Sequence, residues 1–138
     1  MKKLLSMTIL LMMGLAGCNP FEASNPIEPT EHSMVINFEN HANFDFYGLE
    51  VAILNSSSGT VNADGSKIAK GEIISFEFLE EDFALDGDTE MQVAIIKNNE
   101  GEVIPINQKV TIELANNAEI LFELTGESIN EAEIKRIK

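Results

Sequence analysis

The sequence predicts an all-β fold, an antiparallel β-sandwich of the immunoglobulin-like type with about seven or eight strands. From residue 34 onward, apolar residues recur at every second position, which is the pattern of strands with one face in a core. Clusters of Gly, Asn and Asp separate these short segments and supply the backbone conformations that tight turns need. The same region has no helical periodicity. Short strands at regular spacing with turns between them are typical of a sandwich.

Seven segments carry the strand pattern. The first places Met34, Ile36 and Phe38 on one face, and the second adds Ala52 and Leu54 to its apolar positions, so we expect that strand to be covered on both sides. β-branched or aromatic residues occupy alternate positions in the others. In chain order the predicted strands are 34–40, 47–55, 71–80, 90–97, 101–106, 109–114 and 119–124.

Turn residues lie between these segments, in the stretches SSSG, NADGS, LDGD, NNEG and ANNA. The stretch KNNEGEV, residues 97–103, is the strongest hairpin signal, because its Asn and Gly residues stand between two apolar segments. Pro105 cannot donate a backbone hydrogen bond, so we expect it on an edge strand or beside a bulge.

The last segment, residues 128–138, has two interpretations. Ser128 followed by Glu131 fits a capping box that could open a short helix. Alternation of Ala132, Ile134 and Arg136 with their neighbours also suits a final strand, and we favour the strand.

The beginning of the chain has the layout of an export signal. Lys2 and Lys3 precede an apolar segment, residues 4–15, that carries no charge. About twelve residues make roughly 18 Å of helix, which is short of the ~30 Å needed to span a membrane. The segment ends in Leu15-Ala16-Gly17-Cys18, and Cys18 is the single cysteine of the chain.

These four residues resemble the lipobox of bacterial lipoproteins. The resemblance implies that the peptide is cut between Gly17 and Cys18, and that the sulfur of Cys18 carries a diacylglycerol, with further acylation such as palmitate on the new amino terminus. Two or more acyl chains hold a protein on a bilayer firmly. The alternatives are a cysteine that is only a small buried residue, or an ordinary cleaved signal, which would favour an A-x-A-like site that is absent before Asn19.

The predicted organisation has three parts. Residues 1–17 are a signal peptide, residues 18–33 are the lipidated cysteine and a Pro-rich tether, and residues 34–138 are the β-sandwich domain. Pro20, Pro26 and Pro29 make the tether semi-extended. With Cys18 lipidated no disulfide can form, so the domain depends on its hydrophobic core.

The charge is strongly negative, at −14 for the whole chain. Loss of Lys2 and Lys3 with the signal would leave 7 basic against 23 acidic residues, a net charge of about −16. This excludes nucleic acid as a partner, because phosphates need Lys and Arg. It would attract cations or basic proteins, although an acidic surface also serves simply to keep a domain soluble.

The sequence contains no common nucleotide, zinc or hydrolase motif, so we predict no catalytic residues and no cofactor. Of the two histidines, His32 lies in the tether, where we expect it to be solvated. His41 lies near Glu39 and Asp45, and we interpret this stretch as a polar loop between strands rather than as a metal site or a His–Asp couple.

Acidic loops offer a possible weak cation site. An EF-hand frame over residues 60–71 fails at both ends, since Thr60 and Gly71 replace the acidic ligands. The stretch EEDFALDGDTE places Asp82, Asp86 and Asp88 close together in sequence, where they could bind calcium weakly. The alternative, which we favour, is a solvated connection whose Phe83 and Leu85 enter the core.

Anchor, tether and fold together predict a non-enzymatic binding or structural module, lipid-anchored in the cell membrane and facing outside the cytoplasm, on the outer surface if the cell is Gram-positive. The predicted partners are the membrane, through the lipid on Cys18, and a basic extracellular protein or wall polymer. The alternatives are an inhibitor of a basic extracellular hydrolase, or a calcium-binding or enzymatic domain that uses its Asp and Glu clusters.

Overall fold

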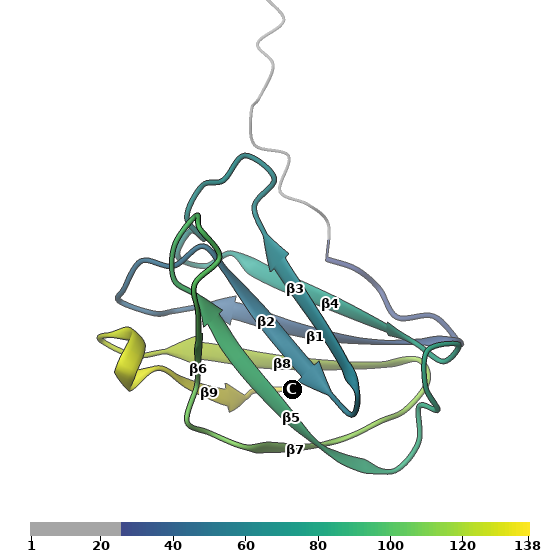
Figure 1. The fold of residues 1–138 in the computed structure, drawn as a ribbon. Coiled ribbons are helices and arrows are strands. Elements are labelled where there is room, and N and C mark those ends of the chain that lie inside the picture. Colours follow the sequence, from purple (N-terminus) through teal and green to yellow (C-terminus); the bar gives the residue numbers. More distant parts are fainter. Residues whose placement is uncertain (1–25) are drawn as a thin grey trace, which may run out of the picture.

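The computed structural model describes residues 26–138, which fold into two packed β-sheets with no α-helix in that range (Figure 1). The all-β prediction is confirmed. The elements are β1 (Ser33–Asn40), β2 (Gly48–Ile53), β3 (Ser56–Val61), β4 (Ile73–Leu79), β5 (Asp88–Ile96), β6 (Val103–Pro105), β7 (Val110–Glu113), β8 (Ala118–Thr125), the 3-10 turn η1 (Ile129–Glu131) and β9 (Glu133–Arg136).

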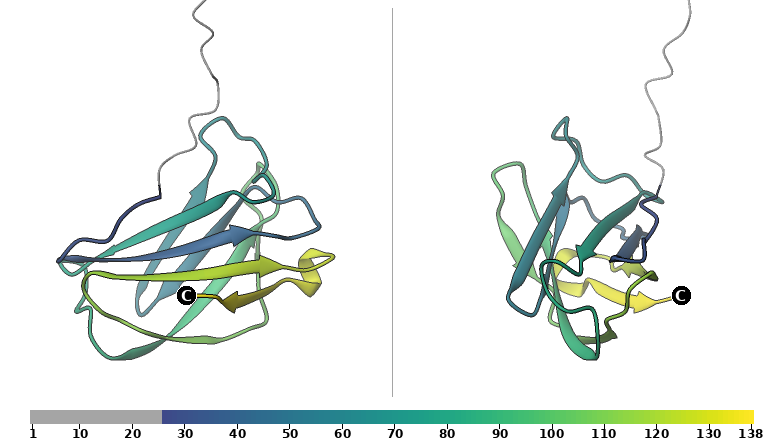
Figure 2. Two further views of the ribbon diagram at one scale, coloured as in Figure 1. Left: turned by 180° about the vertical axis from the view of Figure 1, so that it is seen from behind. Right: turned by 90° about the vertical axis from the view of Figure 1, so that its right-hand side faces the viewer.

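One sheet has the strand order β4-β1-β8-β9, and the other has the order β3-β2-β5-β6. β7 also pairs with β5, so β6 and β7 occupy the same edge of β5 one after the other. The strands of the second sheet run obliquely across those of the first (Figure 1), and the view from behind shows β4, β1, β8 and β9 side by side (Figure 2).

The core lies between the sheets and follows the period-two pattern. Phe38 of β1 is fully buried; its ring stacks on Phe122 of β8 at 5.5 Å between centroids and meets the ring of Phe76 of β4 edge-on at 5.8 Å. Leu49 and Ile95 face these aromatic residues from the second sheet and are also fully buried. Alternate residues point into one shared core, which explains why these strands could be predicted.

The expectation of a wholly antiparallel sandwich was wrong at one pair of strands. β1 runs antiparallel to β4 but parallel to β8, with Met34 opposite Ala118 and Phe38 opposite Phe122. Parallel neighbours need a long connection, and here the whole chain from β2 to β7 lies between the two strands.

The expectation of a turn at SSSG was also wrong, because β3 begins there. The turn consists of Leu54 and Asn55, which join β2 to β3 in a two-residue hairpin with Ile53 opposite Ser56. Leu54, expected in a covered strand, is 56% exposed and has φ +54. β3 lacks apolar alternation because it lies at the sheet edge, where neither of its faces is buried.

Other local predictions are confirmed. KNNEGEV forms the β5–β6 hairpin, in which Lys97 N donates to Glu102 O at 2.8 Å and Gly101 has φ +81. Pro105 lies on the edge strand β6. The tail contains the favoured strand as β9, and the alternative helix is reduced to the single turn η1, where Ser128 makes no side-chain capping bond. The described residues thus form nine strands, not seven or eight.

Candidate functional site

The residues predicted for lipidation and cleavage, Gly17 and Cys18, lie outside the described residues. Asp82, Asp86 and Asp88 are exposed in and beside the β4–β5 connection. Within residues 26–138 no group of three or more His, Cys, Asp or Glu side chains is arranged to hold a metal ion. The structure therefore does not gather these three aspartates into a ligand set.

The same connection has the packing that we favoured. The ring of Phe83 lies 6.1 Å from that of Phe78, and Leu85 is only 8% exposed. These two apolar side chains fix the connection to the core while its carboxylates face solvent.

His41 follows β1 and lies beside Glu39, one of the two carboxylates near it in sequence, and beside Glu123 in place of Asp45. Its Nε2 lies 3.0 Å from Glu39 Oε1 and 3.9 Å from Glu123 Oε1, and these two glutamates stand opposite each other on β1 and β8. Asp45 pairs instead with Lys67 at 2.7 Å, and this contact raises the pKa of the lysine. Since Asp45 pairs with Lys67, His41 and Asp45 form no couple in the described part of the chain, and the imidazole lies next to two facing carboxylates.

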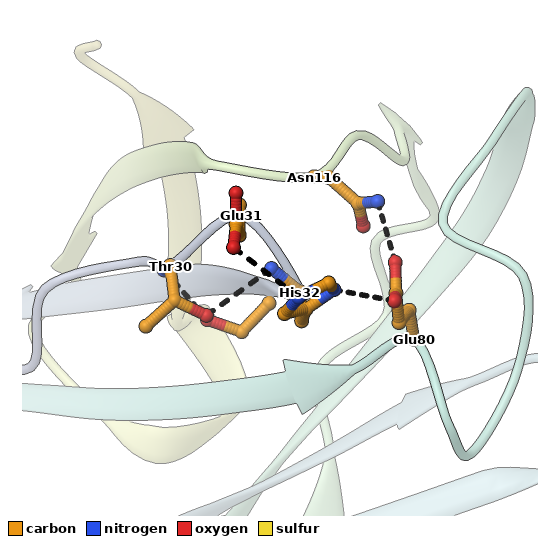
Figure 3. A network of polar contacts seen from close by, with 6 residues as sticks. Thr30, Glu31, His32, Glu80 and Asn116 are labelled. Carbon is orange, nitrogen blue, oxygen red and sulfur yellow. Dashed lines mark hydrogen bonds and ion pairs between the residues drawn. The ribbon is translucent and has the colours of Figure 1, made fainter.

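His32 is exposed, as expected, with 66% of its side chain accessible to solvent, but it is also held on the domain. Its Nδ1 lies 2.5 Å from Glu80 Oε1, while Asn116 donates to Glu80 Oε2 at 2.7 Å (Figure 3). The backbone adds a bond from Glu80 N to His32 O at 2.9 Å. The hydrogen bonds from His32 and Asn116 lower the pKa of Glu80. The end of the predicted tether is thus held on the loops at this end of the sandwich.

A groove of about 880 Å³ opens at the side where β6 and β9 end their sheets. One wall is the chain from β6 into β7, residues 104–108, and the other is η1 with the start of β9, residues 129–133. Ile104, Pro105 and Ile129 give it apolar surface. The two walls come from opposite sheets, so the groove belongs to the tertiary fold and not to either strand alone.

Gln108 holds the two walls together. Its side-chain Nε2 donates to Ile134 O at 2.8 Å, and Ile134 N donates to Gln108 Oε1 at 3.0 Å. The side-chain amide thereby makes the two hydrogen bonds that a neighbouring strand would make to the backbone of Ile134 in β9. This pairing fixes the distance between the walls at the end of the groove.

Gly126 shapes the second wall. It has φ +137, a conformation that side chains rarely adopt, and a Cβ there would lie 2.7 Å from Glu131 O. The missing side chain lets η1 fold back against the end of β8.

The electrostatics of the groove are one-sided. Glu131 and Glu133 line it together with the amides of Asn107, Gln108 and Asn130, and none of its lining residues is basic. All but one of the 23 acidic residues, and only 7 basic ones, lie in residues 26–138, giving this region a net charge of −15. The groove is thus suited to a cationic group with an apolar flank.

Sequence reasoning did not find this groove. Its walls are more than 20 residues apart in the chain, and neither has a recognisable motif. The sequence indicated its parts separately, through Pro105 at a sheet edge and the capping-box residues Ser128 and Glu131, but nothing in it brought the two walls together.

No protein-family model matches the chain, and a search of curated proteins finds no match. Among residues 26–138 there is no helix with the length and apolar character needed to cross a membrane.

Proposed function

We propose that the chain is a non-enzymatic binding module, lipid-anchored through Cys18 and facing outside the cytoplasm. The lipobox-like residues 15–18 support the anchor, and the Pro-containing segment that follows supports a tether. The groove between β6–β7 and η1–β9 supports the binding role, because it joins apolar surface to two carboxylates at a position accessible to solvent.

The groove is the observation that carries the proposal. Its partner is a basic protein or a cationic wall polymer, whose positive groups would face Glu131 and Glu133 while an apolar part covers Ile104 and Ile129. The charge of −15 on residues 26–138 would steer such a partner toward the domain, and this attraction falls with salt.

Crosslinking on intact cells tests this role. We expect the native chain to give a discrete crosslinked species that disappears at high salt and in the double variant Glu131→Gln, Glu133→Gln. The double variant Glu81→Gln, Glu100→Gln removes the same two charges from exposed loops away from the groove and is the control. A species that is unchanged in the double variant would place the binding surface elsewhere.

The anchor is tested separately. Cells fed an alkyne-tagged fatty acid should label the native chain and leave Cys18→Ala unlabelled and either freed or mislocalised, with the sandwich still folded. An unlabelled native chain, or a Cys18→Ala chain that is labelled as strongly as the native one, would contradict lipid anchoring.

A second candidate function is inhibition of a basic extracellular hydrolase, favoured by the same net charge. Its signature is a stoichiometric loss of hydrolase activity on addition of the chain. The Glu131 and Glu133 double variant should relieve that loss if the groove contacts the enzyme.

We further propose that the sandwich is immunoglobulin-like in the broad sense. The chain passes between the sheets from β1 to β2, from β3 to β4, from β4 to β5 and from β7 to β8, which is the crossing style of Greek-key sandwiches. The parallel pairing of β1 with β8 is a departure from an all-antiparallel arrangement.

A further inference from the structure

We propose that β3 accepts an extended, lysine- or arginine-bearing segment of a partner protein, which adds a strand to the five-stranded sheet. The inference takes the chain to be a binding module but concerns a surface separate from the groove. β3 is an edge strand of six residues, SSSGTV, with no charge, no proline and neither face buried. Charged side chains and prolines normally protect the edge strands of natural sheets, and an edge without them is a template for another strand.

On the other side of the sandwich, the edge strands β6 and β9 are protected against pairing with a further strand. Pro105 removes one donor from the edge of β6, and the Gln108 side chain occupies the outer edge of β9. β3 has neither device. In β3 the backbone N–H and C=O groups of successive residues point alternately toward β2 and away from it. Ser56, next to the two-residue turn, forms a hydrogen-bonded pair with Ile53 of β2. Ser57, Gly59 and Val61 therefore direct their N–H and C=O groups away from β2.

Gly59 and Glu50 specify the chemistry of the added strand. Gly59 stands directly opposite Glu50 on the outer face of the sheet. Its backbone does not require glycine, since φ is not positive and a Cβ would meet only Leu49 O at 3.9 Å and the Ile96 Cδ1 at 4.0 Å. Gly48 differs, because a Cβ there would lie 2.1 Å from Thr60 O.

Because Gly59 has no side chain, no side chain of β3 stands between Glu50 and the open edge of the sheet. Within residues 26–138 Glu50 forms no ion pair and no side-chain hydrogen bond. A strand added beside β3 would put its residue opposite Gly59 about 10 Å from the Glu50 backbone, within the combined reach of a glutamate and a lysine. Glu50 is therefore placed to pair with a basic side chain on that strand.

Charge also selects the occupant. A second copy of the chain would bring another region of charge −15 to this edge, and the repulsion opposes association. A basic segment of a different protein gains from the same field.

The test uses the full-length chain and short peptides of alternating threonine and valine, with lysine, glutamine or glutamate at the central position. We expect the lysine peptide to bind most tightly and to slow hydrogen exchange at the amides of Ser57, Gly59 and Val61. Ser57→Pro removes only an outward N–H and should weaken binding at least about tenfold. Ser57→Ala keeps that N–H and is the matched control.

Two further variants test the role of charge. Glu50→Gln should weaken the lysine peptide about threefold and leave the glutamine peptide unchanged, whereas Glu113→Gln, on the far strand of the same sheet, should change neither. Gly59→Thr places a side chain between Glu50 and the open edge and should remove the preference for lysine. Equal binding of all three peptides, or no protection of β3 by any of them, would overturn the inference.

Self-association is checked by sedimentation. If the native chain dimerises and Ser57→Pro is monomeric, the occupant is a second copy and the assignment to a basic partner is wrong. The groove variants Glu131→Gln and Glu133→Gln should leave peptide binding at β3 intact, so failure of one proposal is distinguishable from failure of the other.

Discussion

Gln108 and Ile134 are joined by two hydrogen bonds that imitate the pairing of neighbouring strands. The Gln108 amide accepts from Ile134 N at 3.0 Å and donates to Ile134 O at 2.8 Å. One side chain from the β6–β7 connection of the five-stranded sheet thereby pairs with the outer edge of the four-stranded sheet at Ile134. Because both sheets meet at this contact, it closes one side of the sandwich and sets the width of the groove.

Gln108→Ala should destabilise the domain by about 1–3 kcal/mol, because it leaves the N–H and C=O of Ile134 without partners in a half-buried position. Urea unfolding measures the loss, and amide exchange at Ile134 should accelerate. Asn107→Ala, at the exposed neighbouring position, is the control and should change stability by less than about 0.5 kcal/mol. Equal midpoints for the two variants would contradict this role of Gln108.

Leu54→Gly should stabilise the domain by about 0.5–1 kcal/mol. Leu54 is at the first turn position of the β2–β3 hairpin with φ +54, a conformation that costs a leucine about 1–2 kcal/mol and glycine nothing, and its exposed side chain buries little. Asn117→Gly is the comparison: Asn117 has φ +57, but asparagine tolerates this conformation, so the gain should be smaller. Thermal unfolding of both variants measures the two gains, and a loss of stability in Leu54→Gly would contradict the inference that the backbone is strained at Leu54.

The domain should lose stability in acid because Glu80, which is hydrogen-bonded to His32 and Asn116, becomes protonated. The hydrogen bonds from His32 and Asn116 lower the pKa of Glu80 below the ordinary 4.5. The ionised carboxyl therefore contributes stability at all pH values above 4.5, and this contribution is lost as the pH falls through the lowered pKa. Urea midpoints measured from neutral pH downward should fall more steeply for the native chain than for Glu80→Gln. Glu81→Gln removes the adjacent charge and should follow the native curve; parallel curves for all three would refute the coupling.

The strands that could be predicted from the sequence are those in which buried apolar residues alternate with more exposed ones. Phe38, Phe76 and Phe122 lie on three neighbouring strands, and each stands in an alternating segment because one side faces the core. β3 escaped prediction for the opposite reason: Ser56, Ser58 and the other residues of this edge strand bury neither face, so no apolar period marks it.

Pairing and the groove depend on contacts between distant parts of the chain. Local patterning does not encode that β8 runs parallel to β1, since either direction would bury the same residues. Gln108 could not be linked to Ile134 either, because a glutamine in a polar stretch carries no sign of a backbone partner on another sheet. Both features require the tertiary structure.

Gly126→Ala should destabilise the domain by about 2–4 kcal/mol and disturb the groove. The φ of +137 is open mainly to glycine, and the new Cβ would lie 2.7 Å from Glu131 O and 3.0 Å from Ala132 Cα, both of them backbone atoms that cannot rotate away. η1 would have to move, and with it Glu131 in the groove wall.

Gly101→Ala separates conformational strain from collision. Gly101 has φ +81 but nothing within 4 Å of an added Cβ, so Gly101→Ala should lower the free energy of unfolding by only about 1 kcal/mol. Urea unfolding gives both values, and amide exchange at Asn43, which donates to Gly126 O at 2.8 Å, reports whether the end of β8 has shifted. Equal costs for the two alanine variants would mean that η1 yields easily, and Gly126 would then not be what holds this wall of the groove in place.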